Sequence, residues 1–291
     1  MSLIGTAREW DAWCIRHDRR NRTLGFIPTM GCLHEGHFSL IRKAREQNDL
    51  VAVSVFVNPT QFGPGEDYET YPRDIERDYR LAMEAGADIV FHPAVEEIYP
   101  QGASTEVEVQ GPLTQKLCGA SRPAHFKGVA TVVSILFHIL RPDRAYFGQK
   151  DAQQAAVLKK MVRDLHIPVE LVVCPIVREA DGLAKSSRNL YLKPTERRQA
   201  AALCRGLERA RGFLASGAEE RADAARLKEV IRAEIEAQPL AEVEYVEILD
   251  SDTLDDIRTI EPGKQALAAV AVRFGKTRLI DNMILTPEIG R

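Results

Sequence analysis

The sequence lacks the features that mark several large classes of protein. Its five cysteines among 291 residues are odd in number and scattered, with no C-x-x-C pair, so we expect neither a disulfide framework nor a zinc site. The longest apolar stretch, residues 129–140, contains polar residues and is too short to cross a bilayer. The first residues lack the basic-then-apolar order of a secretory signal. These absences predict a cytoplasmic protein with reduced cysteines.

An excess of basic charge is also missing. Lys and Arg number 39 against 42 for Asp and Glu, the formal net charge is −3, and neither half of the chain carries a basic tail. We therefore expect no binding to nucleic acid or to a membrane through bulk electrostatics. The chain also has no G-x-x-x-x-G-K-[ST] phosphate loop and no G-x-G-x-x-G dinucleotide loop. Any nucleotide site must use another arrangement.

Apolar strands and amphipathic helices alternate through the first 175 residues. The run LVAVSVFV is almost wholly apolar and β-branched, which is typical of a strand buried on both faces of a parallel sheet. The alternation predicts an α/β domain over residues 1–175 with a Rossmann-like, doubly wound parallel sheet. The expected strands are 24–28, 50–57, 88–91, 144–147 and 169–174, and the expected helices are 37–47, 75–85, 129–140 and 152–165.

The pattern changes after Pro175. A long helix is expected over residues 195–216, because Thr195 can cap its start and Gly217 can close it. Residues 176–291 are predicted to form a second, smaller α+β domain. The further elements expected there are a helix at 222–237 and strands at 243–249, 266–273 and 278–285.

The most informative segment is PTMGCLHEGH, which stands between a predicted buried strand and a predicted helix. Ligands dock at that edge of an open parallel sheet. His34 and His37 are three residues apart, so their rings share one face of the first helical turn, where phosphate also binds well. Gly31 and Gly36 would let the backbone approach a nucleotide closely. Alternatively the pair lies on an ordinary surface; zinc binding would need a further ligand at a usual spacing.

A second segment places two hydroxyl groups between two cations, Lys185-Ser186-Ser187-Arg188. After the glycine of Asp181-Gly182, such a loop could clamp a polyphosphate, or it could be a solvated interdomain loop. A third segment, GQKDAQQ, follows the predicted strand 144–147. Its Lys150 could neutralise phosphate, and Asp151 could hold a ribose hydroxyl or simply cap a helix.

Two more segments suit a small acidic substrate. Asn58 and Gln61 follow the strand LVAVSVFV and offer two amides beside an aromatic ring, although an Asn-Pro turn also commonly ends a strand. Arg122 and His125 precede the apolar helix 129–140, where they could bind an anion or be surface charge.

The motifs PTMGCLHEGH, FVNPTQF, YPRD, SRPAHFKGVATVV, PDRAYFGQKDAQQ and DGLAKSSRNLYL occur in an order and spacing that resembles the pantoate–β-alanine ligase (pantothenate synthetase) family. This family belongs to the nucleotidylyltransferase superfamily and is related in fold to class I aminoacyl-tRNA synthetases. The resemblance implies a Rossmann-like domain with a small lid domain and a homodimer. It also implies activation of pantoate by ATP with Mg²⁺, followed by transfer of the pantoyl group to β-alanine, so that pantothenate, AMP and pyrophosphate form.

The resemblance implies a role for each motif residue. ATP would contact Met30, Gly31, Cys32, Leu33, His34, Glu35, Gly36, His37, Gly148, Gln149, Lys150, Asp151, the backbone of Val177, Lys185, Ser186, Ser187 and Arg188. The catalytic residues would be His34, His37, Lys150, Ser186, Ser187 and Arg188, with His37 as proton donor. Pantoate and β-alanine would contact Gln61, Gln154, Asn58, Arg122 and His125. Asp78 would be a candidate magnesium contact beside the ATP phosphates. Lys185 departs from the family, in which Met or Leu is usual.

Two other functions share some of these features. A nucleotidylyltransferase would use the same H-x-G-H element but would keep the nucleotide in its product, whereas the ligase releases AMP. A regulatory protein without turnover would bind ATP and release no pyrophosphate. The intact pair of His34 and His37, together with Lys150, favours an enzyme.

Overall fold

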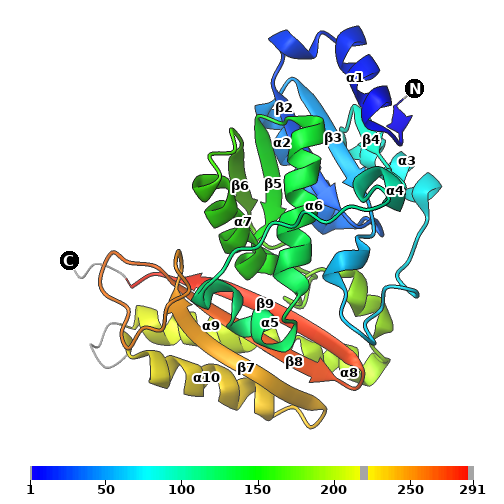
Figure 1. Cartoon of the computed structure of the whole chain (residues 1–291). Helices are drawn as coiled ribbons and strands as arrows, with labels where there is room; N and C mark the ends of the chain where they lie inside the picture. The colour runs from blue at the N-terminus through cyan, green and yellow to red at the C-terminus, as the bar shows by residue number, and fades with distance from the viewer. Residues whose placement is uncertain (1, 217–221, 288–291) are drawn as a thin grey trace. The chain divides into compact units, whose positions relative to one another are not determined.

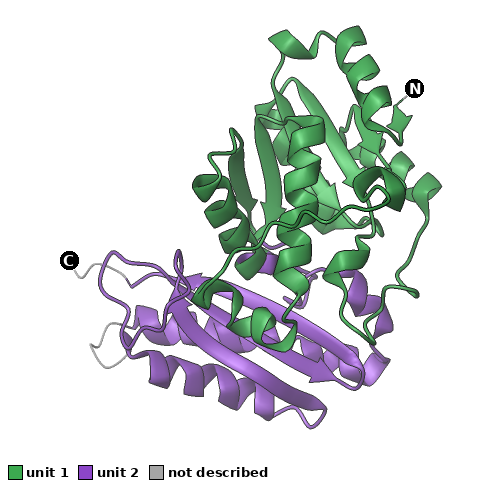
Figure 2. Ribbon diagram, in the orientation of Figure 1, with its two compact units in different colours: residues 1–149, 153–175 green, residues 150–152, 176–291 purple. Residues whose placement is uncertain are grey.

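The computed structural model describes residues 2–216 and 222–287, and the chain divides into two compact units (Figures 1 and 2). Unit 1 comprises the residues up to Gln149 together with Gln153–Pro175. Unit 2 comprises Lys150–Ala152 and the residues from Ile176 onward. The short segment Lys150–Ala152 is thus grouped with the second unit, although the sequence places it within the first predicted domain.

Unit 1 contains a six-stranded parallel sheet, which confirms the predicted Rossmann-like fold. Its strands follow the order β1-β4-β3-β2-β5-β6. Their bounds are Leu3–Ile4 (β1), Leu24–Thr29 (β2), Leu50–Val55 (β3), Ile89–Phe91 (β4), Arg144–Gly148 (β5) and Glu170–Cys174 (β6). Every residue of β3 is buried, as its unbroken apolar run predicted. The two-residue β1 was not expected.

Helices cover both faces of this sheet (Figure 1). The helix α2 shares one core with β2 and β3, in which Ile41 packs near Ile27. On the other face, Phe137 of α6 meets Phe26 of β2 edge to face, with ring centroids 6.3 Å apart. The helices are α1 (Ala7–Arg16), α2 (Glu35–Gln47), α3 (Ile75–Ala85), α4 (Val95–Ile98), α5 (Leu117–Ser121), α6 (His125–Leu140) and α7 (Ala152–Asp164). Of these, α1, α4 and α5 were not predicted.

The strand order reverses beside β2. The chain runs from β2 to β3 and β4 on one side and then returns, so that β5 pairs with β2 on its other side. In open α/β sheets, ligands bind outside the carboxyl ends of the strands at such a reversal. The carboxyl ends that meet here are those of β2 and β5, at Thr29 and Gly148. Two of the predicted nucleotide segments begin at these residues.

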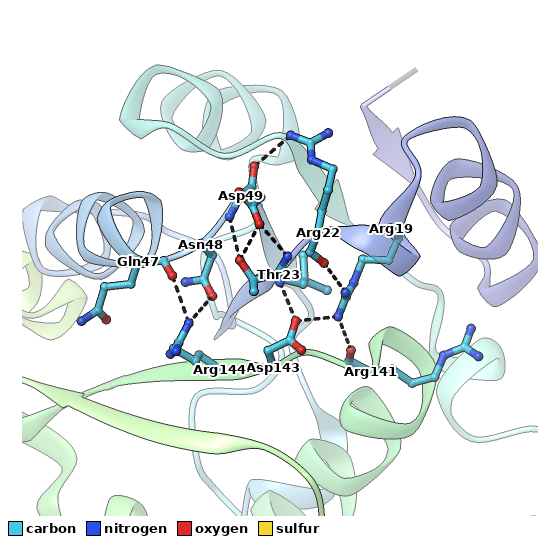
Figure 3. A network of polar contacts seen from close by, with 10 residues as sticks. Arg19, Arg22, Thr23, Gln47, Asn48, Asp49, Arg141, Asp143 and Arg144 are labelled. Atoms are coloured by element: carbon cyan, nitrogen blue, oxygen red, sulfur yellow. Dashed lines mark hydrogen bonds and ion pairs between the residues drawn. The ribbon is translucent and has the colours of Figure 1, made fainter.

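A polar network fixes the opposite, amino-terminal ends of the strands (Figure 3). Asp49 Oδ2 accepts hydrogen bonds from the backbone N–H and the hydroxyl of Thr23, each at 2.8 Å. Asp143 Oδ2 accepts from Leu24 N at 2.7 Å and from Arg19 Nη2 at 2.8 Å. Asp49, in the loop before β3, and Asp143, in the loop before β5, therefore both bind the start of β2.

Unit 2 is a smaller α+β unit, as predicted. Its strands form an antiparallel sheet in the order β7-β8-β9. Leu207 and Ile231 share one core with Val270 of the central strand. The helices are α8 (Pro194–Ala200), α9 (Ala202–Ala215) and α10 (Ala224–Glu236), and the strands are β7 (Ala241–Asp250), β8 (Ala266–Phe274) and β9 (Thr277–Leu285).

The prediction of one long helix over 195–216 is wrong. Two helices, α8 and α9, meet at Ala201, and α8 begins with Pro194 at its first turn and Lys193 at its cap in place of Thr195. The junction lies among three successive alanines, the residue with the best helix propensity, so no local signal marks it. Gly217, the expected end, lies outside the described residues. Among the residues described, no helix combines the length and apolar character that a membrane span requires.

Candidate active site

The loop after β2 is held by a buried carboxylate. Asp78 of α3 is 1% exposed, and its two oxygens accept hydrogen bonds from Cys32 N and Leu33 N, each at 2.8 Å. Gly31 adopts a φ of +87°, and a Cβ there would lie 2.8 Å from Asp78 Oδ2. Glycine is needed at this position for both reasons. Asp78 therefore holds the shape of the loop, and its role as a magnesium contact stays a prediction.

The two histidines cap the helix that follows this loop. His34 is the N-cap of α2, and its Nδ1 accepts a hydrogen bond from Gly36 N at 3.1 Å. His37 Nδ1 accepts one from His34 N at 3.3 Å, and the two ring centroids are 4.2 Å apart. In each neutral ring the proton is therefore assigned to Nε2. The expected sharing of one helical face is present, and both rings carry an N–H donor at Nε2.

The thiol of Cys32 is not activated by its position in this loop. Burial raises the pKa of Cys32, the carboxylate of Asp78 raises it further, and Arg77 opposes the effect. The thiolate, which is the reactive form, is thereby disfavoured.

Four of the predicted site residues meet beside the carboxyl end of β3. The short turn η2 (Pro59–Gln61) places Gln61 Nε2 at 3.0 Å from Met30 Sδ. The backbone carbonyl of Gln61 accepts hydrogen bonds from Arg122 Nη2 at 3.2 Å and from His125 Nδ1 at 2.9 Å. These contacts bring the loop after β2, the turn after β3 and the start of α6 together.

Arg122 is also paired with an acid that the sequence did not single out. Its Nε and Nη2 donate to the two carboxylate oxygens of Glu66 at 2.7 and 2.6 Å. Burial opposes ionisation of Glu66, but the hydrogen bonds and charge of Arg122 hold its pKa below the ordinary value. Arg122 Nη1 lies 3.1 Å from His125 Nε2. The guanidinium therefore ties the 62–73 loop to the start of α6.

Asn58 lies beneath this cluster and is 1% exposed. Its Nδ2 donates to Gln61 Oε1 at 3.2 Å and to the carbonyl of Gly128 at 3.1 Å. Its Oδ1 accepts from the hydroxyl of Tyr99 at 2.8 Å. A Cβ at position 128 would lie 2.4 Å from Thr60 O, so the turn packs directly on α6. Asn58 thus links the turn after β3 to α6, while its part in a substrate pocket stays a prediction, and Tyr99 was missed.

Of the two glutamines in α7, the first is a structural residue. Gln153 is buried, accepts from Cys118 N at 3.0 Å, and donates to Leu113 O at 2.9 Å and Lys116 O at 2.7 Å. Gln154 is partly exposed. Its role as a pantoate ligand stays a prediction.

Of the remaining predicted nucleotide contacts, Gly148 and Gln149 belong to unit 1, and Lys150, Asp151, Val177 and 185–188 belong to unit 2. The carbonyl of Lys150 accepts a hydrogen bond from Asn282 Nδ2 of β9 at 3.0 Å. The neighbouring Asp281 is fully buried and pairs with Arg178 through both oxygens, at 2.7 and 3.0 Å. Charge and hydrogen bonds from Asp281 raise the pKa of Arg178 against the effect of burial. The backbone of Lys150 is therefore attached to β9 beside the buried Asp281–Arg178 pair.

The loop that contains the predicted clamp folds back on itself. Lys185 N donates to Val177 O at 2.9 Å, and Lys185 Nζ lies 3.2 Å from Glu179 Oε2. Ser186 caps the short helix η5 (Ser187–Tyr191) by accepting from Arg188 N at 3.3 Å. Lys185, the residue that departs from the family pattern, thus has an ion-pair partner within the loop.

Comparison with known proteins places the whole chain beside one family. A sequence model described as pantoate-beta-alanine ligase matches residues 2–284. A protein named pantothenate synthetase from Heliobacterium modesticaldum is 55% identical over 285 residues, which are 98% of this chain and 99% of that protein. One of the same name from Moorella thermoacetica is 56% identical over 285 residues, again 98% of this chain and 99% of that protein.

Solved structures of the same kind match the fold. The pantothenate synthetase of Thermus thermophilus has a TM-score of 0.91 at 47% identity, covering 99% of this chain and 100% of that one. The pantoate-beta-alanine ligase of Francisella tularensis, solved with beta-gamma ATP and β-alanine, has a TM-score of 0.77 at 33% identity, covering 98% and 97%.

Proposed function

The chain belongs to the pantoate–β-alanine ligase family, and we propose that it makes pantothenate in two steps through a pantoyl-adenylate. In the first step a carboxylate oxygen of pantoate attacks the α-phosphorus of ATP, and the bond to the β-phosphate oxygen breaks to release pyrophosphate. In the second, the amine of β-alanine attacks the acyl carbon, loses a proton, and AMP leaves with the acyl oxygen. No covalent enzyme intermediate is needed, so the protein acts by positioning and charge stabilisation.

The single observation that carries this proposal is the capping of α2 by the Nδ1 atoms of His34 and His37. Because the Nδ1 atom of each ring accepts a backbone N–H, each Nε2 presents a fixed donor at the carboxyl edge of β2. We propose that these donors bind the phosphate oxygens and strengthen as charge builds on the departing pyrophosphate. They act as hydrogen-bond donors, which refines the expected role of His37 as a proton donor.

The other assignments follow from the same family membership. We propose that Gln61 and Gln154 bind pantoate, with Asn58, Arg122 and His125 forming the wall around it. ATP would also contact the backbone of Val177 and the residues Gly148, Gln149, Lys150, Asp151, Lys185, Ser186, Ser187 and Arg188. The Francisella tularensis relative with its bound nucleotide and β-alanine supports ATP and β-alanine as substrates. Magnesium would enter with ATP, its phosphates supplying ligands. A homodimer and a cytoplasmic location stay predictions.

The test is product formation from MgATP with each acid withheld in turn. We expect pyrophosphate with pantoate alone, and AMP with pantothenate only when β-alanine is added. With both acids present, a final product that retains the nucleotide would indicate a nucleotidylyltransferase, and ATP binding without pyrophosphate release would indicate a regulatory protein. His37→Ala should keep the fold and lower the rate of pyrophosphate release by about 10² or more, the scale of a lost transition-state donor. Near-native release by this variant would contradict the assignment.

A further inference from the structure

We propose that Tyr99 is a positioning residue, whose hydroxyl holds Gln61 in its substrate-binding place through the side chain of Asn58. The inference rests on the proposed function, in which Gln61 binds pantoate. Tyr99 directly follows α4, and no sequence motif pointed to it. All the residues involved lie in unit 1.

The Asn58 amide is held in one orientation by neighbours on both sides. Its Nδ2 faces two acceptors, Gln61 Oε1 and Gly128 O. Its Oδ1 faces three donors, the hydroxyls of Tyr99 at 2.8 Å and Thr60 at 3.0 Å and the N–H of Thr60 at 3.3 Å. The bond from Tyr99 is the shortest of them. Burial raises the pKa of the Tyr99 hydroxyl despite its hydrogen bonds, so it stays protonated and able to donate.

The orientation of Asn58 in turn sets that of Gln61. Because Gln61 Oε1 accepts from Asn58, the amide nitrogen of Gln61 must point the other way, where it meets Met30 Sδ at 3.0 Å. A thioether sulfur is a weak acceptor. A substrate carboxylate or hydroxyl oxygen can therefore replace it with a net gain. Tyr99 thus helps to position the Gln61 amide nitrogen, whose contact with Met30 Sδ a substrate oxygen can easily replace.

Tyr99→Phe tests this relay because it removes one hydroxyl and keeps the ring beside Phe56, whose centroid is 6.4 Å away. The matched control is Tyr146→Phe. Tyr146 is fully buried in the same unit, and its hydroxyl is also bonded to an asparagine amide, Asn48 Nδ2 at 2.7 Å. Both variants lose one hydroxyl that is bonded to an asparagine amide, but Tyr146 has no part in the Gln61 cluster.

We expect Tyr99→Phe to raise the KM for pantoate by about tenfold, which is the effect of one net hydrogen bond. The KM values for ATP and β-alanine should change less than about twofold, and Tyr146→Phe should leave all three within that range. A pantoate KM unchanged in Tyr99→Phe, or a rise in all three KM values together, would overturn the positioning role.

A crystal structure of Tyr99→Phe separates this proposal from the proposed function. Displacement of the Gln61 amide relative to the wild type supports the relay. If the wild type then makes no pantothenate, only the proposed function is refuted. An unmoved Gln61 amide refutes the relay whatever the wild-type activity.

Discussion

The imidazole of His34 packs over Gly36 so closely that a Cβ at position 36 would lie 2.9 Å from Cε1 of the ring. The glycine of the H-x-G-H element therefore leaves room for the ring of the first histidine. Its φ is not in the left-handed region, so steric contact with the ring, and not backbone conformation, demands glycine.

Gly36→Ala should push the His34 ring from its cap position and lower the rate of pyrophosphate release by about 10- to 100-fold through loss of one oriented donor. Gly212→Ala is the control, because a Cβ at this exposed position in α9 meets only open space. That variant should be fully active and more stable by about 0.5–1 kcal/mol. Wild-type pyrophosphate release in Gly36→Ala would contradict the steric argument.

Asp78→Asn should loosen the loop after β2. One of the two N–H groups, of Cys32 or Leu33, would face an amide N–H in place of an oxygen. We expect a loss of about 1–3 kcal/mol in the free energy of unfolding and a raised KM for ATP. Denaturant unfolding measures the free energy of unfolding, and steady-state kinetics measures the KM for ATP.

The control for Asp78 is Asp74→Asn in the same helix. Asp74 caps α3 by accepting from Arg77 N at 3.0 Å, and asparagine caps a helix equally well. Equal effects of the two variants would show that Asp78 has no special role in the loop.

Lys185→Met should raise the KM for ATP several-fold at low salt. The Lys185–Glu179 pair is partly exposed and adds little stability, so a polyphosphate can draw Lys185 away from Glu179. Glu179→Gln removes this competitor and should lower the KM for ATP. Both effects should shrink as salt rises. If Lys185→Met has the wild-type KM, Lys185 makes no phosphate contact.

The Glu66–Arg122 pair should contribute stability that depends on pH. The folded-state pKa of Glu66 lies below its ordinary value of 4.5, so its contribution is present above that value and is lost as pH falls through the folded-state pKa. Urea unfolding should find Glu66→Gln less stable than the wild type near neutral pH, with the gap closing in acid. A gap that is constant with pH would rule out this linkage.

Local signals in the sequence were enough to predict much of the fold. The bounds predicted for α3, 75–85, agree with the structure, in which Asp74 caps the helix and Gly86 ends it with a φ of +114°. The spacing of His34 and His37 likewise predicted their shared face. The break at Ala201 had no local cause and was missed.

The supporting residues of the site could not be predicted in this way. Glu66 meets Arg122 across 56 positions of the chain, and Tyr99 meets Asn58 across 41. Asp78 reaches Cys32 across 46. No periodicity or motif records such pairs, since the fold alone brings them together. The motifs therefore led to the residues proposed to meet the substrates, whereas Glu66 and Tyr99, which hold those residues, became visible only in the fold.

The cap arrangement of the two histidines also limits what their rings can do with protons. A second proton on either ring would occupy the Nδ1 lone pair that now receives a backbone N–H, so it would remove one side-chain cap of α2, while the backbone hydrogen bonds from His37 N and Phe38 N to His34 O remain. Each ring therefore gives up a helix-capping hydrogen bond when it takes up a second proton. Acid inactivation should accordingly be accompanied by weaker capping of the first turn of α2.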